Sequence, residues 1–181
     1  IGNIGWPEVE DIVAGHDDLL ARGIADPARS AIAGWSWGGY PTLLMQGMPQ
    51  PITAATGMDA LTHAVEAYIN RWPHADTEQH CVAAVRMIFG NLQRAYDDGN
   101  DMAAREAMAL ASFYAGLAFT KAYVGYVHAF SHKLGGMYGV PHGLANAITL
   151  PYVLDFLLDS PRARDGLAEL AVVIGAGSAG E

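Results

Sequence analysis

The stretch that decides the fold is GYVHAFSHKLGGMYGVPHGLANAITLPYV, residues 125–153. His128 and His132 stand four residues apart in its first half, and a Gly-Val-Pro break then precedes His142. Residues four apart share one face of an α-helix, and Gly and Pro mark helix ends, so the stretch predicts two helices joined by a short turn. Three histidines on this helix pair make it the first place to look for a site.

Outward from this stretch, helical periodicity extends over most of the chain. Apolar residues recur at helical spacing, and clusters of Pro, Gly, Asp and Asn separate the periodic segments. We expect no strand in the residues that follow the segment near 47–51. Thr77, followed by two acidic or amide residues, is expected to cap a helix. The predicted helices span residues 7–22, 54–70, 77–97, 101–122, 125–136, 142–157 and 161–173.

The first 48 residues have a different character. SAIAGW (30–35) has the composition of a short buried strand, GWSWGG (34–39) of a sharp turn, and a further helix is expected from about residue 40. The predicted fold is therefore mainly α. A helical domain over 49–181 follows a helix–strand–elbow–helix fragment over 1–48.

The charge composition of the chain argues against some classes of binding partner. The net charge is −9, with 10 basic against 19 acidic residues, and the basic ones are scattered. Nucleic acids and anionic membranes need a basic patch, so we expect neither as a partner. Cys81 is the only cysteine and cannot form an intrachain disulfide, which favours a cytoplasmic protein. No apolar run approaches the roughly 20 residues that span a bilayer.

A candidate metal site follows from histidine and aspartate spacing. Asp59 and His63 are four residues apart on a predicted helix, as are His128 and His132 on a later one, and His142 follows. Imidazoles with one carboxylate suit Fe(II) or Zn(II) better than Mg²⁺ or Ca²⁺. Histidines beside apolar faces are, however, usually satisfied core or surface residues, so the spacing alone leaves both interpretations open.

Three stretches resemble the helical metal-binding domain of iron-containing alcohol dehydrogenases: TAATGMDALTHAVEAY (53–68), ASFYAGLAF (111–119) and residues 125–153. The resemblance implies that the metal ligands are Asp59, His63, His128 and His142. It also implies that His132 is an additional active-site histidine near the substrate. In that family the metal polarises the oxygen of a small alcohol or aldehyde while hydride passes to a nicotinamide cofactor.

Two parts of that family have no counterpart among these residues. We find neither its Gly-rich α/β domain nor the last part of its helical domain, and both ends of the chain look like cuts through longer proteins. We therefore expect no NAD(P) site here and doubt dehydrogenase turnover. GAGSAG (175–180) matches a dinucleotide fingerprint, but the helix and acidic residue that the fingerprint requires do not follow. A helix end is the better interpretation.

The GWSWGG turn fits the G-x-S-x-G nucleophile elbow. Residues 7–44 around it resemble the catalytic domain of prolyl oligopeptidases and acylaminoacyl-peptidases. That resemblance implies Ser36 as nucleophile and the backbone N–H of Trp37 as an oxyanion donor. The family's Asp and His have no counterpart, so Ser36 is either an inert relic or has a base supplied by another histidine. We interpret the chain as a chimera with a junction near residues 47–51.

Four functions remain open at this stage. The first is a metal-binding domain of a dehydrogenase, and the second is a serine esterase or peptidase-like hydrolase acting through Ser36. The third is a metal-dependent hydrolase at the same histidine site, and the fourth is a chimera without catalysis. We also expect a homo-oligomer, as a dimer, because both parent folds have lost parts that cover apolar faces.

Overall fold

The computed structural model describes residues 6–26, 48–70 and 75–177, and the chain divides into two compact units, Ile1–Met48 and Pro49–Glu181. In the first unit, helix α1 spans Trp6–Ala21, close to the predicted 7–22. The chain leaves the helix at Gly23, two residues after Ala21, where a φ of 68° is the left-handed conformation that favours glycine. The predicted strand at 30–35, the elbow with Ser36 and Trp37, and the helix after it lie outside the described residues.

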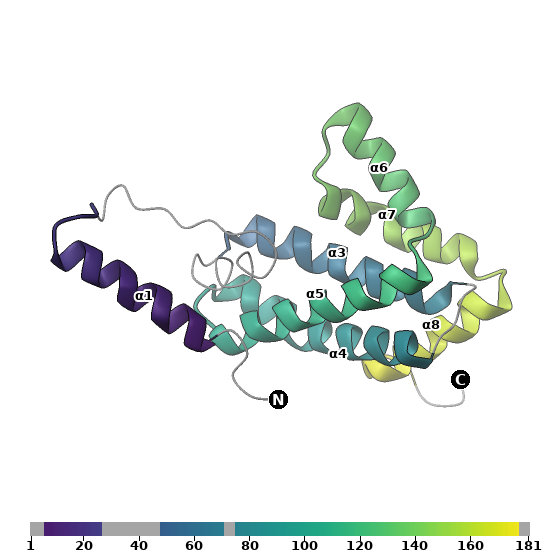
Figure 1. The fold of residues 1–181 in the computed structure, drawn as a ribbon. Coiled ribbons are helices and arrows are strands. Elements are labelled where there is room, and N and C mark those ends of the chain that lie inside the picture. Colours follow the sequence, from purple (N-terminus) through teal and green to yellow (C-terminus); the bar gives the residue numbers. More distant parts are fainter. Residues whose placement is uncertain (1–5, 27–47, 71–74, 178–181) are drawn as a thin grey trace. The chain divides into compact units, whose positions relative to one another are not determined.

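Every regular element in the described part of the second unit is a helix, as predicted (Figure 1). Its helices are α3 (Gln50–Ile69), α4 (Ala75–Asp97), α5 (Met102–Ala122), α6 (Tyr126–Tyr138), α7 (His142–Leu157) and α8 (Pro161–Val173). Helices α3, α4 and α5 pack on one another, and α8 contacts α3 and α4. Helices α6 and α7 form a pair on the other side of α3, so α3 is the central element that both groups share.

The helix ends follow from identifiable residues. Asp101 caps α5 by accepting a hydrogen bond from the backbone N–H of Ala104, and Gly139 ends α6 in the left-handed conformation. The expected cap at Thr77 is wrong. Helix α4 begins two residues earlier, at Ala75, so Thr77 lies buried inside its first turn and Asp76 supplies part of the acidic start.

The main core is rich in alanine. Helix α5 contributes Ala111, Ala115, Ala118 and Ala122, which recur at helical spacing and are buried. Small side chains let helix axes approach closely, and the larger Ile88 of α4 fills the remaining space. A smaller core of Val127, Leu150 and Val153 joins α6 to α7. These two cores hold both faces of α3 in place.

None of the described helices is by itself long and apolar enough to cross a bilayer. The α5–α6 pair, bent by 106°, meets the same criteria of length and composition when the two helices are taken together.

Candidate metal centre

Helix α3 carries the first two predicted ligands. Asp59 and His63 lie one turn apart on the same face, with 3.6 Å between Asp59 Oδ1 and His63 Nε2. The His63 ring stacks between Phe119 of α5 and His128 of α6, with ring centroids 4.2 and 4.1 Å away. Packing therefore sets the orientation of this imidazole.

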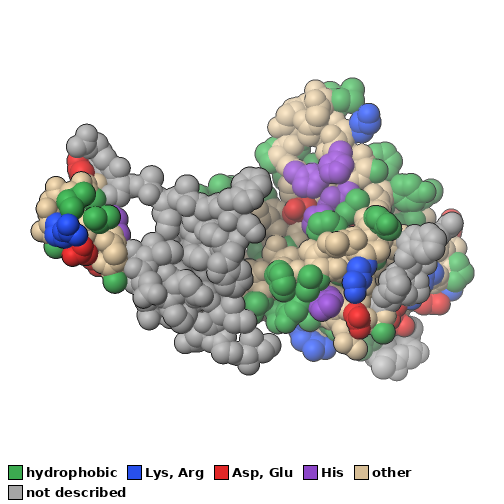
Figure 2. All heavy atoms as spheres, viewed as in Figure 1, with side chains coloured by type: hydrophobic (Ala, Val, Ile, Leu, Met, Phe, Trp, Pro, Cys, Tyr) green, Lys and Arg blue, Asp and Glu red, His purple; other side chains and the backbone are tan. Residues whose placement is uncertain are grey.

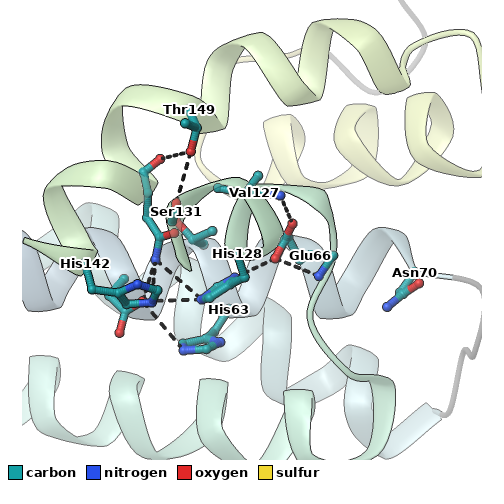
Figure 3. Close-up of polar contacts among 12 residues, drawn as sticks. His63, Glu66, Asn70, Val127, His128, Ser131, His142 and Thr149 are labelled. Carbon is teal, nitrogen blue, oxygen red and sulfur yellow. Dashed lines mark hydrogen bonds and ion pairs between the residues drawn. The ribbon is translucent and has the colours of Figure 1, made fainter. Parts of the chain in front are cut away.

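Helices α6 and α7 bring two more imidazoles to the same carboxylate (Figure 3). His128 Nε2 lies 3.4 Å and His142 Nε2 3.3 Å from Asp59 Oδ1. One ligand atom of each of these three residues lies within 4.8 Å of the others. Two ligands bound about 2.1 Å from one ion are separated by about 3–3.5 Å, so these distances suit a shared ion. His63 is not part of this group of three, although its Nε2 lies 3.6 Å from Asp59 Oδ1.

His132 lies at the mouth of the cluster. Its exposed ring stacks on His142 with 5.1 Å between ring centroids and lies 6.1 Å from that of His128. Figure 2 shows histidine side chains gathered at the surface of the helical unit next to an acidic side chain. The cluster is therefore open to solvent on the side of His132 and His142, while His128 is buried.

The environment sets the charge of each group. Burial by itself would raise the pKa of Asp59. The hydrogen bond with His128 and the nearby imidazoles outweigh burial, so the pKa of Asp59 is lowered. Burial, aided by His128, lowers the pKa of His63 to about 4. Burial also works to lower the pKa of His128, but hydrogen bonds with Asp59 and Glu66 raise it to about 9. At neutral pH a metal ion therefore competes with a proton at His128.

Two residues that the sequence analysis missed complete the cluster. Asn146, one turn after His142, donates from Nδ2 to Asp59 Oδ1 over 2.6 Å and lies 3.2 Å from His142 Nε2. Glu66, three residues after His63, has Oε2 2.6 Å from His128 Nδ1. Their spacing of three and four residues from a predicted ligand was the available signal, because such residues share a helix face.

Gly143 explains why α7 can reach α3. A Cβ at this position would lie 1.9 Å from the backbone oxygen of Ala55, one turn before Asp59. Only glycine allows this approach of the two backbones. Gly143, the residue after His142, thus lets the start of α7 approach α3 closely enough to bring His142 beside Asp59.

The GAGSAG stretch (175–180) is described only as far as residue 177. Helix α8 ends at Val173, and Gly175 has a φ of 75° with its N–H bonded to the Val172 oxygen. The helix end expected at this position is therefore present, while the absence of a dinucleotide-binding loop stays a prediction.

The donor set fits a divalent ion. Imidazoles joined by one ionised carboxylate are ligands of Fe(II) and Zn(II). Of these donors, Asp59, His128 and His142 lie closest together, with the two Nε2 atoms 3.4 and 3.3 Å from Asp59 Oδ1.

Comparisons with known families agree with this two-part chain. Residues 53–181 match the Fe-containing alcohol dehydrogenase family, C-terminal, and residues 2–81 match the prolyl oligopeptidase family. The chimeric composition predicted from the sequence is thereby confirmed. The two matched ranges overlap over 53–81, so the junction near residues 47–51 stays a prediction.

Individual relatives point the same way. The chain is 49% identical to 1,3-propanediol dehydrogenase of Citrobacter freundii over 141 residues, 74% of this chain and 36% of that protein. It is 47% identical to alcohol dehydrogenase 4 of Schizosaccharomyces pombe over 131 residues, 72% of this chain and 31% of that protein.

A solved structure gives the same result for the fold. The alcohol dehydrogenase from Oenococcus oeni superposes with a TM-score of 0.71 and 37% identity, over 77% of this chain and 38% of that one. The chain thus spans about a third of the length of these relatives. It belongs to the Fe-containing alcohol dehydrogenase family, and the matched region is that family's C-terminal part.

Proposed function

We propose that the helical unit binds a divalent metal ion through Asp59, His63, His128 and His142, with Fe(II) as the ion and Zn(II) as the alternative. The convergence of His128 and His142 on one oxygen of Asp59, at 3.4 and 3.3 Å, carries the proposal. Membership of a family whose name specifies iron supports it independently.

The relatives, whose names specify alcohols, support a proposal for the class of reaction. We infer that the chain supplies the metal-binding part of a dehydrogenase acting on a small alcohol or aldehyde. A bound ion supplies Lewis-acid polarisation of the substrate oxygen. We also propose that His132, which is exposed and stacked on His142, exchanges a proton between substrate and solvent. Self-association as a dimer and a cytoplasmic location stay predictions.

Metal binding by ligand variants tests the first proposal. We expect Co(II), used as a spectroscopic probe, to bind the full chain. Four ligands together contribute about 10–16 kcal/mol in structural sites, so loss of one should weaken binding by about 100-fold or more. His142→Ala and Asp59→Ala should show this loss. His80→Ala is the matched control, because His80 stacks on Tyr114 away from the cluster. Equal Co(II) affinity in all the variants would contradict the site.

A second candidate function is serine hydrolysis, which the prolyl oligopeptidase match over residues 2–81 favours. In this proposal Ser36 is the nucleophile and the Trp37 backbone N–H stabilises the oxyanion. Hydrolysis of an activated ester separates the candidates. Activity lost in Ser36→Ala but retained with a chelator supports the serine, whereas activity lost only with a chelator supports metal-dependent hydrolysis.

A further inference from the structure

Glu66 is a buried carboxylate to which the predicted ligand set gives no role. Its side chain, on α3, is 2% exposed and makes three short polar contacts with the start of α6. The backbone N–H of Gly125 donates to Oε2 over 2.8 Å, and that of Val127 donates to Oε1 over 2.7 Å. The third contact joins Oε2 to His128 Nδ1 over 2.6 Å (Figure 3).

The third contact selects one tautomer of His128. Carboxylates face both ring nitrogens, but the contact of Nδ1 with Glu66 is 2.6 Å long, whereas that of Nε2 with Asp59 is 3.4 Å long. A carboxylate only accepts hydrogen bonds, so the single proton of a neutral His128 ring resides on Nδ1, which makes the shorter contact. Nε2 then keeps its lone pair, and Nε2 is the atom that lies 3.4 Å from Asp59 Oδ1. The opposite tautomer would present an N–H to the metal centre, where it could not act as a ligand.

The two backbone contacts set the position of α6. No side chain within α6 caps its start, and Glu66 from another helix accepts N–H bonds there instead. A Cβ on Gly125 would lie 2.7 Å from Glu66 Oε1, so a larger residue at this position would displace the Glu66 carboxylate. Asp59, His63 and Glu66 recur at helical spacing, and one face of α3 therefore carries two proposed ligands and the group that orients a third.

We propose that Glu66 is a positioning residue of the metal centre. It holds His128 in the Nδ1–H tautomer with Nε2 directed at Asp59, and this preorganisation raises the affinity of the site for a divalent ion. The inference rests on the proposed metal-binding function and deepens it.

Glu66→Gln is the informative variant, because it preserves size while replacing one acceptor oxygen with an NH₂ donor. Residues that orient a metal-bound histidine typically contribute about 10–100-fold to metal affinity, so we expect Co(II) binding to weaken by that factor. The matched control is Glu169→Gln. Glu169 accepts a hydrogen bond from Tyr68 within the same helical unit, and its replacement removes the same charge. Glu169→Gln should bind Co(II) like the parent chain.

A second readout needs neither metal nor variant. Two-bond ¹H–¹⁵N correlation of labelled histidines, recorded above the pKa of about 9 at which His128 becomes neutral, reports its tautomer in the parent chain, which we expect to be Nδ1–H. An Nε2–H tautomer overturns the proposal even if Glu66→Gln does not fold. Co(II) affinity in Glu66→Gln within twofold of the parent also overturns it, while a parent chain that binds no Co(II) refutes the metal-binding function itself.

Discussion

Gly143 has no side chain, and this allows helices α7 and α3 to pack closely at the proposed metal centre. Its position against Ala55 leaves no space for a Cβ, since the nearest atom would be backbone oxygen at 1.9 Å. We expect Gly143→Ala to push α7 away from α3, to destabilise the fold by about 1–3 kcal/mol and to weaken Co(II) binding, because His142 moves from Asp59. Urea unfolding and Co(II) titration measure the two effects.

The matched control at the residue scale is Gly136→Ala. Gly136 lies in α6, and nothing is within 4 Å of the position its Cβ would take. Alanine favours helix over glycine by about 0.5–1 kcal/mol, so this variant should be as stable as the parent or slightly more so. If both glycine variants behaved alike, the close approach at Gly143 would not be what holds α7 in place.

At the scale of elements, α4 supports the centre without contributing to it. Ile88 is 1% exposed in the main core, whereas its neighbour Phe89 is 55% exposed. We expect Ile88→Ala to cost about 2–5 kcal/mol through lost burial and a cavity. The helical signal in urea unfolding measures this loss. Phe89→Ala, at the surface, should change stability by no more than about 0.5 kcal/mol.

The same pair of variants separates folding from binding. Helix α4 supplies none of the proposed ligands, so Ile88→Ala should retain the Co(II) affinity of the parent wherever it remains folded. A large loss of affinity in the folded variant would mean that the core under α3 also determines the geometry of Asp59 and His63.

For the whole molecule, the centre links metal binding to folding. Its proposed ligands come from α3, α6 and α7, which converge only in the folded unit. A ligand that binds only the folded state stabilises it by RT ln(1 + [L]/Kd). We therefore expect Co(II) to raise the Tm of the parent chain and to leave that of His142→Ala nearly unchanged.

The pH dependence of this stabilisation has a defined sign. His128 has a pKa of about 9 in the fold against 6.5 for the ordinary side chain. Without metal, the bound proton stabilises the fold at low pH, and this contribution is lost as pH rises from about 6.5 to 9. The affinity for a metal ion rises by up to about tenfold per pH unit over the same range, because His128 must release a proton when the ion binds.

Thermal unfolding at pH 7, 8 and 9, with and without Co(II), measures these opposite trends. The pKa of His63 is about 4, so that ring is already neutral and adds no proton competition in this range. A metal-induced shift in Tm that is independent of pH would show that His128 does not exchange its proton for the ion.

The helices themselves were predictable from the sequence. Their observed limits lie within four residues of the expected ones, and those of α7 and α8 coincide with them. The reason is local. Apolar periodicity, capping aspartate, and Pro and Gly at the ends act over a few residues and are visible along the chain. The failed cap at Thr77 shows the usual limit, because a helix can begin before its best local signal.

The candidate site was only partly predictable. Spacing of four residues placed Asp59 with His63, and family resemblance added His128 and His142. Periodicity shows which residues share a helix face but not which helix lies opposite. The contacts of Glu66 with His128 and of Asn146 with Asp59 span 62 and 87 residues. The sequence by itself therefore determined the helices and most candidate ligands, while only tertiary packing decided which groups orient them, because packing alone brings distant faces together.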